Sequence, residues 1–357
     1  MIDISLCHPQ AMKAFEPHPS FGSVFTPHVL KMELTLGSKP TSAVITPIKD
    51  ENLTPNISSL HYAQCIFEGM KAYRNPSGKI NLFRPEQNAE RFKKSALKLN
   101  MAPVEPEVFL QCLQTFVDFE RDNIPDLEDH SLYLRPLLIA SDPRLKVGQS
   151  EKYLFYIMGA VVGDYFSTGT KKETVSLMVN RDFVRAFPGG LGNVKAAANY
   201  AMGMSSQTFA KEHGCAQVLY LDSVTHNNID ELGGMNFFAV RGNELVTPKL
   251  TDCILPGITR DSLLKLAHRV GLNPVEETMS FDKMALGIES GLVSEVFACG
   301  TAATVQPIGE IIFMENSHAQ PQKISLKNNK IANELRQILL SIQMGQEAAP
   351  NGWIVEI

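Results

Sequence analysis

Hydrophobic positions in the first half of the chain follow two periods, one typical of strands and one typical of helices. Short runs rich in β-branched, leucine and aromatic residues predict strands, and these runs lie at 31–36, 42–46, 71–74, 79–83, 132–140 and 152–162. Apolar residues at helical spacing predict a helix that begins at Pro85 and another over about 109–117. The turn composition NPSG at 75–78 predicts a hairpin. The first thirty residues show no clear period, and we expect an arm there.

The second half continues the alternation of strands and helices. Strands are predicted at 175–179, 217–222 and 294–299, helices at about 194–212 and 259–270, and a hairpin turn at 241–244. Neither half has a regular strand–helix–strand rhythm, so the pattern favours mixed sheets in an α/β or α+β fold.

The length of the chain predicts a division into two domains. A single hydrophobic core stops growing at roughly 250–300 residues, and the chain has 357, so we expect two domains, with a single domain as the alternative. The polar, glycine-containing stretch 163–175 is the predicted linker. It separates an N-terminal domain at 1–162 from a C-terminal domain at 176–357.

Composition and charge exclude several classes of protein. The chain is 44% hydrophobic and 20% charged, with a mean hydropathy of -0.06, which excludes disordered and fibrous classes. A net charge of -5 provides no basic field, so we expect no nucleic-acid partner. The longest apolar run, 153–162, is much shorter than the roughly 20 residues that cross a bilayer, so no membrane association is expected. No export or import signal is recognised, and the expected location is the cytoplasm.

Cysteine and histidine spacing argues against disulfides and metals. The six cysteines contain no C-x-x-C pair and are expected to be reduced and mostly buried; they are Cys7, Cys65, Cys112, Cys215, Cys253 and Cys299. The nine histidines are dispersed without ligand spacing, so we expect no metal site.

One lysine follows a glycine-rich loop. Residues 188–200 read PGGLGNVKAAANY, in which three glycines precede Lys195 at the predicted start of an alanine-rich helix. The positive end of a helix dipole opposes protonation of an amine, and a neutral lysine can act as a nucleophile. The alternative is an ordinary solvated lysine at a helix start. The loop lacks the third glycine of a dinucleotide-binding motif.

Two adjacent carboxylates enter an apolar strand. Successive strand side chains point to opposite faces, so we expect one of Asp230 and Glu231 to point inward and to need a cationic partner. A protonated pyridine nitrogen or a structural arginine would serve. These residues alone do not distinguish the two partners.

Two further segments have the composition of anion-binding loops. Residues 255–260 (LPGITR) place a glycine before a helix start, and residues 299–304 (CGTAAT) end a strand in small residues. Either segment alone could be a plain cap. Together with the lysine and an inward carboxylate, they predict a pocket for pyridoxal phosphate.

The same segments, in this order, resemble those of the branched-chain amino-acid aminotransferases, which are fold type IV pyridoxal-phosphate enzymes. The resemblance rests on PGGLGNVKAAANY at 188–200, ELGGMNFF at 231–238, LPGITRDSLL at 255–264 and CGTAATVQPIG at 299–309. In the first half it extends to SLHYAQCIFEGMKAYR at 59–74 and SLYLRP at 131–136. It implies a two-domain α/β (mixed α+β) fold with a smaller N-terminal α/β domain and a larger C-terminal pseudo-barrel domain. It also implies a homodimer.

The resemblance assigns roles around the cofactor, pyridoxal 5'-phosphate. Lys195 would form the Schiff base and move the proton, Glu231 would keep the pyridine nitrogen protonated, and Tyr200 would hydrogen-bond the phenolic oxygen. The phosphate would be held by Arg91, Ile258, Thr259 and Thr301.

The resemblance also places the substrate. The α-carboxylate would rest on the amides of Thr301 and Ala302. An apolar pocket would surround the side chain, with Leu145 and Val147 reaching over from the second subunit; its other members are Tyr62, Phe67, Tyr133 and Tyr165. Arg135 would bind the γ-carboxylate of glutamate, and the alternative is a salt bridge that holds the fold.

Two positions depart from the family pattern. Gly234 stands where many relatives carry a threonine or serine, which removes one hydroxyl contact. Residues 303–306 (ATVQ) lack the redox C-x-x-C of the animal enzymes, so that thiol switch cannot operate.

The resulting hypothesis is an enzyme that transfers the amino group between L-leucine, L-isoleucine or L-valine and 2-oxoglutarate. The alternatives are a D-amino-acid aminotransferase, an aminodeoxychorismate lyase, or a binding homologue without catalysis. Retention of Lys195 and Glu231 argues against the last of these.

Overall fold

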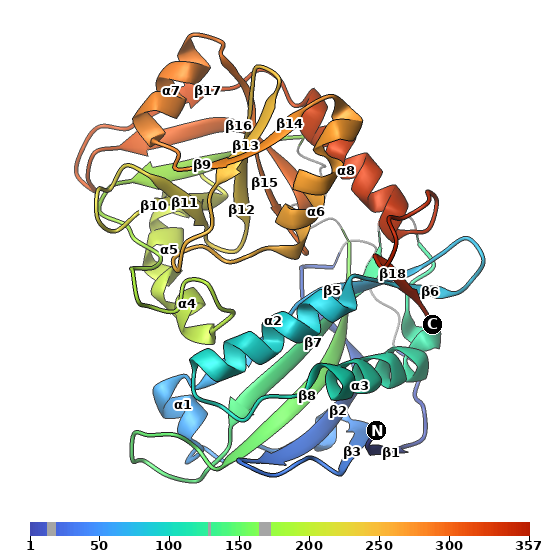
Figure 1. The fold of residues 1–357 in the computed structure, drawn as a ribbon. Helices are drawn as coiled ribbons and strands as arrows, with labels where there is room; N and C mark the ends of the chain where they lie inside the picture. The colour runs from blue at the N-terminus through green and yellow to red at the C-terminus, as the bar shows by residue number, and fades with distance from the viewer. Residues whose placement is uncertain (13–18, 128–129, 164–172) are drawn as a thin grey trace. The chain divides into compact units, whose positions relative to one another are not determined.

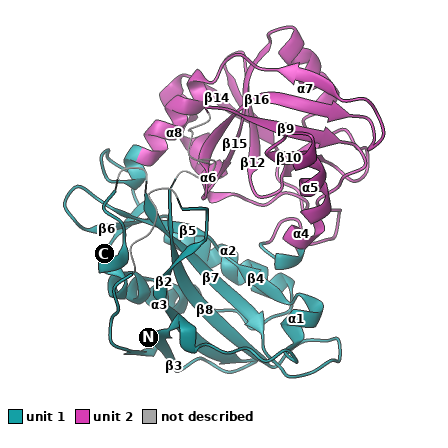
Figure 2. Ribbon diagram, turned by 180° about the vertical axis from the view of Figure 1, so that it is seen from behind, with its two compact units in different colours: residues 1–171, 195–198, 341–357 teal, residues 172–194, 199–340 magenta. Residues whose placement is uncertain are grey.

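The chain folds into two compact units, which Figure 2 distinguishes by colour. The computed structural model describes residues 1–12, 19–127, 130–163 and 173–357. Unit 1 comprises Met1–Lys171, Lys195–Ala198 and Ser341–Ile357, and unit 2 comprises Lys172–Val194 and Asn199–Leu340. Most of the predicted linker, residues 164–172, lies outside the described residues.

The units differ from the predicted domains at two short segments. The C-terminal strand β18 (Ile354–Glu356) pairs with β6 (Ile80–Phe83), which joins the end of the chain to unit 1. Ala196 forms an isolated antiparallel bridge with Ile66, which joins Lys195–Ala198 to the same unit. Unit 1 therefore holds more residues than unit 2, whereas the expected order of sizes was the reverse.

Unit 1 is built on one sheet with the strand order β1-β3-β2-β8-β7-β5-β6-β18, and β4 pairs with β7 (Figure 1). Its other strands are β1 (Asp3–Leu6), β2 (Val24–Thr35), β3 (Ser42–Pro47), β4 (Cys65–Phe67), β5 (Met70–Arg74), β7 (Ser131–Ala140) and β8 (Lys152–Val162). All pairings are antiparallel except that of β1 with β3. The six strands predicted in this half are confirmed, and the arm contributes β1 and the start of β2.

Two helices cover one face of this sheet (Figure 1). They are α2 (Pro85–Lys98) and α3 (Pro106–Phe119), and each carries proline in its first turn, where the missing N–H removes no hydrogen bond. Phe92 of α2, Phe109 of α3 and Phe155 of β8 are fully buried, with ring centroids 5.3–5.9 Å apart. This aromatic cluster joins both helices to the sheet. The short helices of the unit are α1 (Ser58–Tyr62), η1 (Ile48–Asp50) and η2 (Arg121–Asn123).

Unit 2 contains a second sheet, with the strand order β11-β10-β9-β16-β15-β12-β13-β14 and β17 beside β16. The strands are β9 (Val175–Asn180), β10 (Gln217–Leu221), β11 (Ile229–Leu232), β12 (Asn236–Arg241), β13 (Glu244–Pro248), β14 (Asn273–Glu277), β15 (Val293–Gly300), β16 (Thr304–Met314) and β17 (Gln322–Ser325). Only three residues connect β11, at one edge, to β12, five places away in the order, so the sheet must curl back on itself. This curl, together with the mixture of parallel and antiparallel pairs, confirms the mixed α/β fold with a barrel-like C-terminal unit.

The helices of the second half differ from the predicted ones at their ends. The predicted helix at 194–212 is two helices, α4 (Ala197–Met202) and α5 (Met204–Glu212), interrupted at Gly203. The predicted helix at 259–270 is α6 (Ile258–Leu266) followed by the 3-10 turn η3 (Ala267–Val270). The sequence analysis missed α7 (Phe281–Glu289) and α8 (Lys330–Gln343), the latter leading from unit 2 into unit 1.

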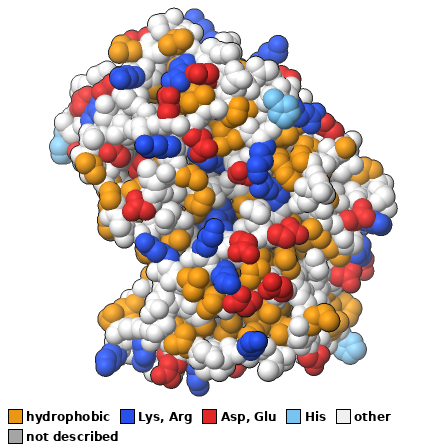
Figure 3. Space-filling model, in the orientation of Figure 1, with side chains coloured by type: hydrophobic (Ala, Val, Ile, Leu, Met, Phe, Trp, Pro, Cys, Tyr) orange, Lys and Arg blue, Asp and Glu red, His pale blue; other side chains and the backbone are white. Residues whose placement is uncertain are grey.

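Other findings bear on the excluded classes. No helix among the described residues is long and apolar enough to span a bilayer. Within the same residues, no three His, Cys, Asp or Glu side chains gather in a way that could hold a metal ion. The six cysteines are free, as expected. Figure 3 shows positive and negative side chains interspersed on one face, which agrees with the small net charge.

The aromatic cluster of unit 1 gives a stability prediction. Phe92→Ala removes a fully buried ring and leaves a cavity, so the free energy of unfolding should fall by about 3–5 kcal/mol in urea denaturation followed by circular dichroism. Leu97→Ala, on the exposed side of the same helix, is the matched control and should have little effect. Equal losses from the two variants would contradict the assigned core.

Candidate functional site

Lys195 lies in unit 1 and its backbone is held on both sides. Its N–H donates to Ser95 Oγ at 3.1 Å, and its carbonyl accepts from the Phe67 N–H at 3.1 Å. Its Nζ atom lies 4.6 Å from the centroid of the Phe67 ring. The expectation that Lys195 begins the helix was wrong, because Ala196 pairs with Ile66 and α4 starts only at Ala197. Strand-like anchoring, and not a helix turn, positions the amine.

The glycine-rich loop before the lysine needs at least one of its glycines for packing within unit 2. A Cβ on Gly192 would lie 2.6 Å from the Cα and carbonyl oxygen of Cys253, which is closer than real contacts allow. Gly189 has φ +80°, a left-handed conformation that glycine adopts without strain. The motif therefore reflects close backbone packing as well as chemistry.

Arg91, predicted to hold phosphate, is paired with a buried glutamate. Its Nε and Nη2 atoms donate to the two carboxylate oxygens of Glu68 at 2.7 and 2.9 Å, and Asn88 adds a third bond at 2.8 Å. Burial by itself raises the pKa of Glu68, but Arg91, Lys195 and Asn88 together hold it below its usual range. Glu68 was not singled out from the sequence. A single carboxylate in the otherwise apolar CIFEGM segment was the available signal.

Arg135 is held by aromatic rings. Its Cζ atom lies 4.4 Å from the centroid of the Phe67 ring and 5.4 Å from that of Tyr133, and Nη2 donates to the Tyr133 hydroxyl at 3.2 Å. Among the described residues, no carboxylate pairs with Arg135, and its buried Nε has no hydrogen-bond partner. The alternative of a salt bridge that holds the fold therefore finds no support. Phe67, Tyr133, Arg135 and Lys195 form one cluster in unit 1.

The remaining substrate-pocket residues predicted in unit 1 are Tyr62, Leu145, Val147 and Tyr165. The Tyr62 hydroxyl donates to the backbone carbonyl of Leu145 in the same chain. Leu145 and Val147 are 68% and 71% exposed, so their side chains cover little of their own unit. Tyr165 lies outside the described residues. The proximity of these residues to the cluster around Phe67 thus stays a prediction.

Glu231 of unit 2 is held by an arginine that the sequence analysis missed. Arg185 Nη2 lies 2.6 Å from its Oε1, Asn236 Nδ2 donates at 2.8 Å, and the Leu255 N–H donates at 3.2 Å. Arg185 also donates to the carbonyls of Gly192 and Cys253. A structural arginine, Arg185, is therefore a cationic partner of Glu231. The sequence had left open whether an arginine or a pyridine nitrogen fills that role. Arg185 lies ten positions before Lys195, and only its position near the glycine-rich loop pointed to it.

The expectation that only one of the two adjacent carboxylates points inward was wrong. Asp230 and Glu231 are 6% and 4% exposed, so both are buried. The register of β11 against β10 shifts here, with three steps in β11 opposite two in β10, which is a β-bulge. A bulge breaks the strict alternation of side chains and re-aims them.

The two predicted anion-binding loops both lie in unit 2. Helix α6 begins after Gly257, whose extended backbone provides no side-chain cap, so amides at the helix start can face an anion. A Cβ on Gly257 would lie 2.0 Å from Asn236 Oδ1, so this position requires glycine. Thr301 and Ala302 occupy the turn between β15 and β16. These features fit the predicted roles of Ile258, Thr259, Thr301 and Ala302.

Tyr200 lies beside the turn that follows Glu231. A Cβ on Gly234 would be 3.9 Å from Tyr200 Cε1, and a Cβ on Gly300 would be 3.4 Å from the Gly234 carbonyl oxygen. Tyr200, Gly234 and the start of the 300–302 turn are therefore neighbours. Nothing closer surrounds Gly234, so packing does not exclude the hydroxyl residue that relatives carry there.

Comparisons with known proteins agree with this arrangement. A family model described as amino-transferase class IV matches residues 65–311. The probable branched-chain-amino-acid aminotransferase of Streptomyces coelicolor is 40% identical over 338 residues, which are 94% of this chain and 92% of that protein. The branched-chain-amino-acid aminotransferase of Mycolicibacterium smegmatis is 37% identical over 349 residues, with coverage of 95% and 92%.

A solved structure shows the same fold. The branched-chain amino acid aminotransferase from Thermobaculum terrenum, in its PLP-form, superposes with a TM-score of 0.68 at 22% identity, covering 92% of this chain and 98% of that one. This likeness concerns the fold, and with the family match it confirms the fold class expected from the sequence.

The ion pair of unit 1 gives a pH-dependent prediction. Glu68→Gln leaves the Arg91 charge buried without its partner and should lower the free energy of unfolding by about 3–5 kcal/mol at pH 7. Because the pKa of Glu68 is lowered in the folded state, its contribution is present at neutral pH and is lost as the pH falls below about 4.3. The difference between wild type and variant in urea denaturation should therefore shrink in acid.

The matched control is Glu90→Gln, an exposed glutamate in the same helix as Arg91, which should leave stability nearly unchanged at both pH values. A pH-independent difference for Glu68→Gln would contradict the ion-pair interpretation.

Proposed function

The chain belongs to the amino-transferase class IV family and is a transaminase, and from this premise we propose that it transfers the amino group between L-leucine, L-isoleucine or L-valine and 2-oxoglutarate. The observation that carries the proposal is the 40% identity, over 94% of the chain, to a protein named for the branched-chain reaction. The apolar and aromatic surroundings of Lys195 and Arg135 support the same substrate class.

We propose pyridoxal 5'-phosphate as the cofactor, since a solved relative of the same fold is described as a PLP holo-form. When bound, this group supplies an electron-withdrawing pyridinium ring that stabilises negative charge at the substrate α-carbon. Glu231 would pair with the ring nitrogen, and Tyr200 would donate to the phenolic oxygen. Phosphate would be bound by Arg91, Ile258, Thr259 and Thr301.

The contacts of Glu231 and Arg91 fit these roles. Arg185, Asn236 and Leu255 all interact with the Glu231 carboxylate, which favours its ionised form, and an ionised carboxylate is what a protonated pyridine nitrogen needs. Arg91 is oriented by two bonds to Glu68, and a planar guanidinium is well suited to binding a phosphate.

Lys195 would bond to the cofactor and then hold or move the proton at its Nζ atom. Its backbone is fixed by Ser95 and by Phe67, so only the side chain has to move between these tasks. The Phe67 ring beside Nζ is apolar and excludes water from the amine on that side. A general base that is held in position contributes to the rate through its geometry.

Arg135 would bind the γ-carboxylate of glutamate, the second substrate of the cycle. Aromatic rings cover the guanidinium on two sides, which presents an apolar surface when an aliphatic side chain is bound. We assign the aliphatic side chain to a pocket that includes Tyr62, Phe67, Tyr133 and Tyr165. The exposed Leu145 and Val147 would complete this pocket in the second subunit of a homodimer. Thr301 and Ala302 amides would bind the α-carboxylate.

The proposed setting is the cytoplasm. Six free cysteines without a disulfide suit a reducing compartment.

An amino-donor panel tests the proposed function. With 2-oxoglutarate as acceptor, L-leucine, L-isoleucine and L-valine should each yield glutamate, whereas D-alanine should not. Activity with D-alanine and none with L-leucine would overturn the substrate assignment.

Borohydride reduction of the purified protein should fix the cofactor to the peptide that contains Lys195. Lys195→Ala should fold normally without turnover, and Lys98→Ala, an exposed lysine in α2, should remain active.

Arg135→Ala tests the glutamate contact. A lost charge-assisted pair should lower kcat/KM for glutamate by at least about tenfold while that for leucine changes less than about threefold. Arg121→Ala, on the surface of unit 1, is the control and should change neither value. Equal losses for both substrates would mean that Arg135 only supports the aromatic cluster.

A further inference from the structure

Unit 2 contains a cavity of about 260 Å³ whose lining includes none of the residues assigned to the cofactor and the substrate. Its walls come from the glycine-rich loop, the 222–230 segment and the 248–254 segment. The lining residues are Pro188, Asp222, Ser223, Val224, Asn228, Ile229, Asp230, Pro248, Lys249, Thr251, Asp252, Cys253, Ile254, Glu277 and Thr278. None of the residues proposed for catalysis or for cofactor and substrate binding is among them.

One carboxylate in this lining has a buried oxygen without a hydrogen-bond partner in the described part of the chain. Asp230 is 6% exposed, and its Oδ2 atom is buried without a hydrogen-bond partner in the described part of the chain. Buried polar groups are normally paired, and an unpaired buried carboxylate costs free energy, so its presence beside a cavity indicates a missing partner. Burial raises the pKa of Asp230 to about 6, with Arg185 opposing the rise and Asp222 and Asp252 adding to it. The group is therefore mostly ionised at neutral pH.

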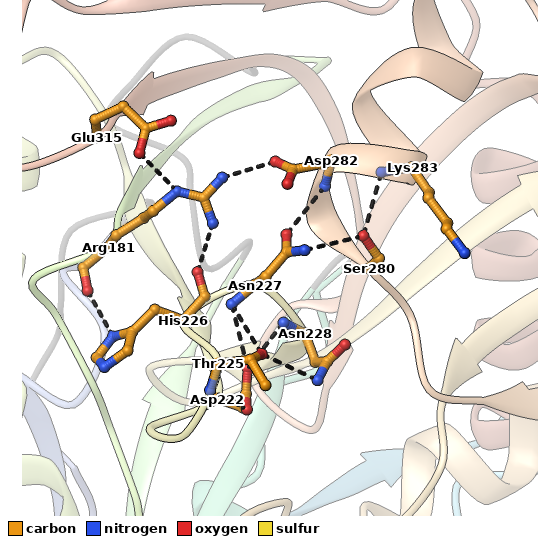
Figure 4. A network of polar contacts seen from close by, with 10 residues as sticks. All are labelled: Arg181, Asp222, Thr225, His226, Asn227, Asn228, Ser280, Asp282, Lys283 and Glu315. Carbon is orange, nitrogen blue, oxygen red and sulfur yellow. Dashed lines mark hydrogen bonds and ion pairs between the residues drawn. The ribbon is translucent and has the colours of Figure 1, made fainter.

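The other carboxylates of the lining already have partners. Figure 4 shows that Asp222 holds its own loop, where it accepts from the backbone N–H groups of Thr225, Asn227 and Asn228. Asp252 accepts from the Gly189 N–H at 2.6 Å, and Glu277 pairs with Arg241. Asp230 is thus the lining carboxylate that remains for a ligand.

The wall formed by the 222–228 loop is rigid. Arg181 donates to the His226 carbonyl and pairs with Asp282 and Glu315, while Asn227 bonds to Ser280 (Figure 4). A wall fixed by such a network is preformed, which lowers the entropy cost of binding.

The chemistry of the lining selects the class of ligand. Four carboxylates against one lysine, the exposed Lys249, favour a cation. A metal ion is disfavoured because no cluster of three metal-binding side chains exists in the described residues. Most of the remaining wall is apolar, with Val224, Ile229 and Ile254 among its members. An organic cation with an apolar body matches both parts.

We propose that this cavity is a second binding site that takes a small ammonium compound with an apolar body, whose N–H group pairs with Asp230. The site is separate from that of the proposed transamination, and its occupation does not depend on that proposal.

Isothermal titration of the holoenzyme with triethylammonium tests the proposal, because a tertiary amine cannot form an imine with an aldehyde cofactor. Saturable binding is expected, and the neutral isostere 3-ethyl-3-pentanol should bind at least about tenfold more weakly. Asp230→Asn should weaken triethylammonium binding by a similar factor. Glu310→Gln, which removes one negative charge from unit 2 outside the cavity, should leave it unchanged.

The pH dependence provides a readout that needs no variant. Binding to the wild type should weaken as the pH falls through about 6, because protonation of Asp230 removes the paired charge. Burial raises the pKa of Cys253 to about 11. Burial also acts to raise the pKa of Asp222, but hydrogen bonds from Thr225, Asn227 and Asn228 hold it below its usual range. Neither of these two wall residues therefore changes charge near pH 6. Val224→Trp should also weaken binding, since Val224 lines the cavity and is 71% exposed, so a larger side chain there occupies cavity space without replacing a core residue.

Two results would overturn the proposal: no saturable binding of triethylammonium, or binding that Asp230→Asn, Val224→Trp and acid all leave unchanged. Failure of the amino-donor panel would not bear on it, since that panel reports on Lys195 and not on this cavity.

Discussion

Two buried glutamates, each paired with a buried arginine, are the constraint on which the polar parts of both units depend. Glu68 with Arg91 belongs to unit 1, and Glu231 with Arg185 to unit 2. Removing charges from water is expensive, and only close pairing with further hydrogen bonds compensates for it. Asn88 supplies that bond in one pair, and Asn236 with Leu255 in the other. The backbone around each pair is consequently held in a definite place.

Backbone hydrogen bonds and close packing at glycines position further residues, in addition to the two ion pairs. Lys195 is held through its peptide groups by Ser95 and Phe67, and its side chain does not determine its own position. In unit 2, Gly192 and Gly257 allow backbone and side chains to approach to distances that a Cβ would forbid. In this transaminase, Ser95 and Phe67 therefore position the backbone of Lys195, while Gly192 and Gly257 allow close packing in unit 2.

Local pattern predicted local structure well, and long-range pairing poorly. Six strands of unit 1 and the helix at Pro85 followed from periodicity and from proline and glycine positions. The helix at 194–212 was wrong because Gly203 interrupts it and Ala196 pairs with a strand instead. Glu68 and Arg185 were missed because their partners lie far away in the sequence, where no period connects them.

By itself, the sequence determined most of the strands and the family, and it predicted Lys195 as the reactive lysine, since spacing and residue type carry that information. Only the tertiary structure decided that Lys195–Ala198 and Ser341–Ile357 join unit 1, that Asp230 and Glu231 are both buried, and that Asp230 lines a cavity. The physical reason is that burial and ion pairing depend on which distant segments meet. The hydrophobic pattern of a sequence indicates that a residue is buried, but it does not indicate which residues contact it in the folded protein.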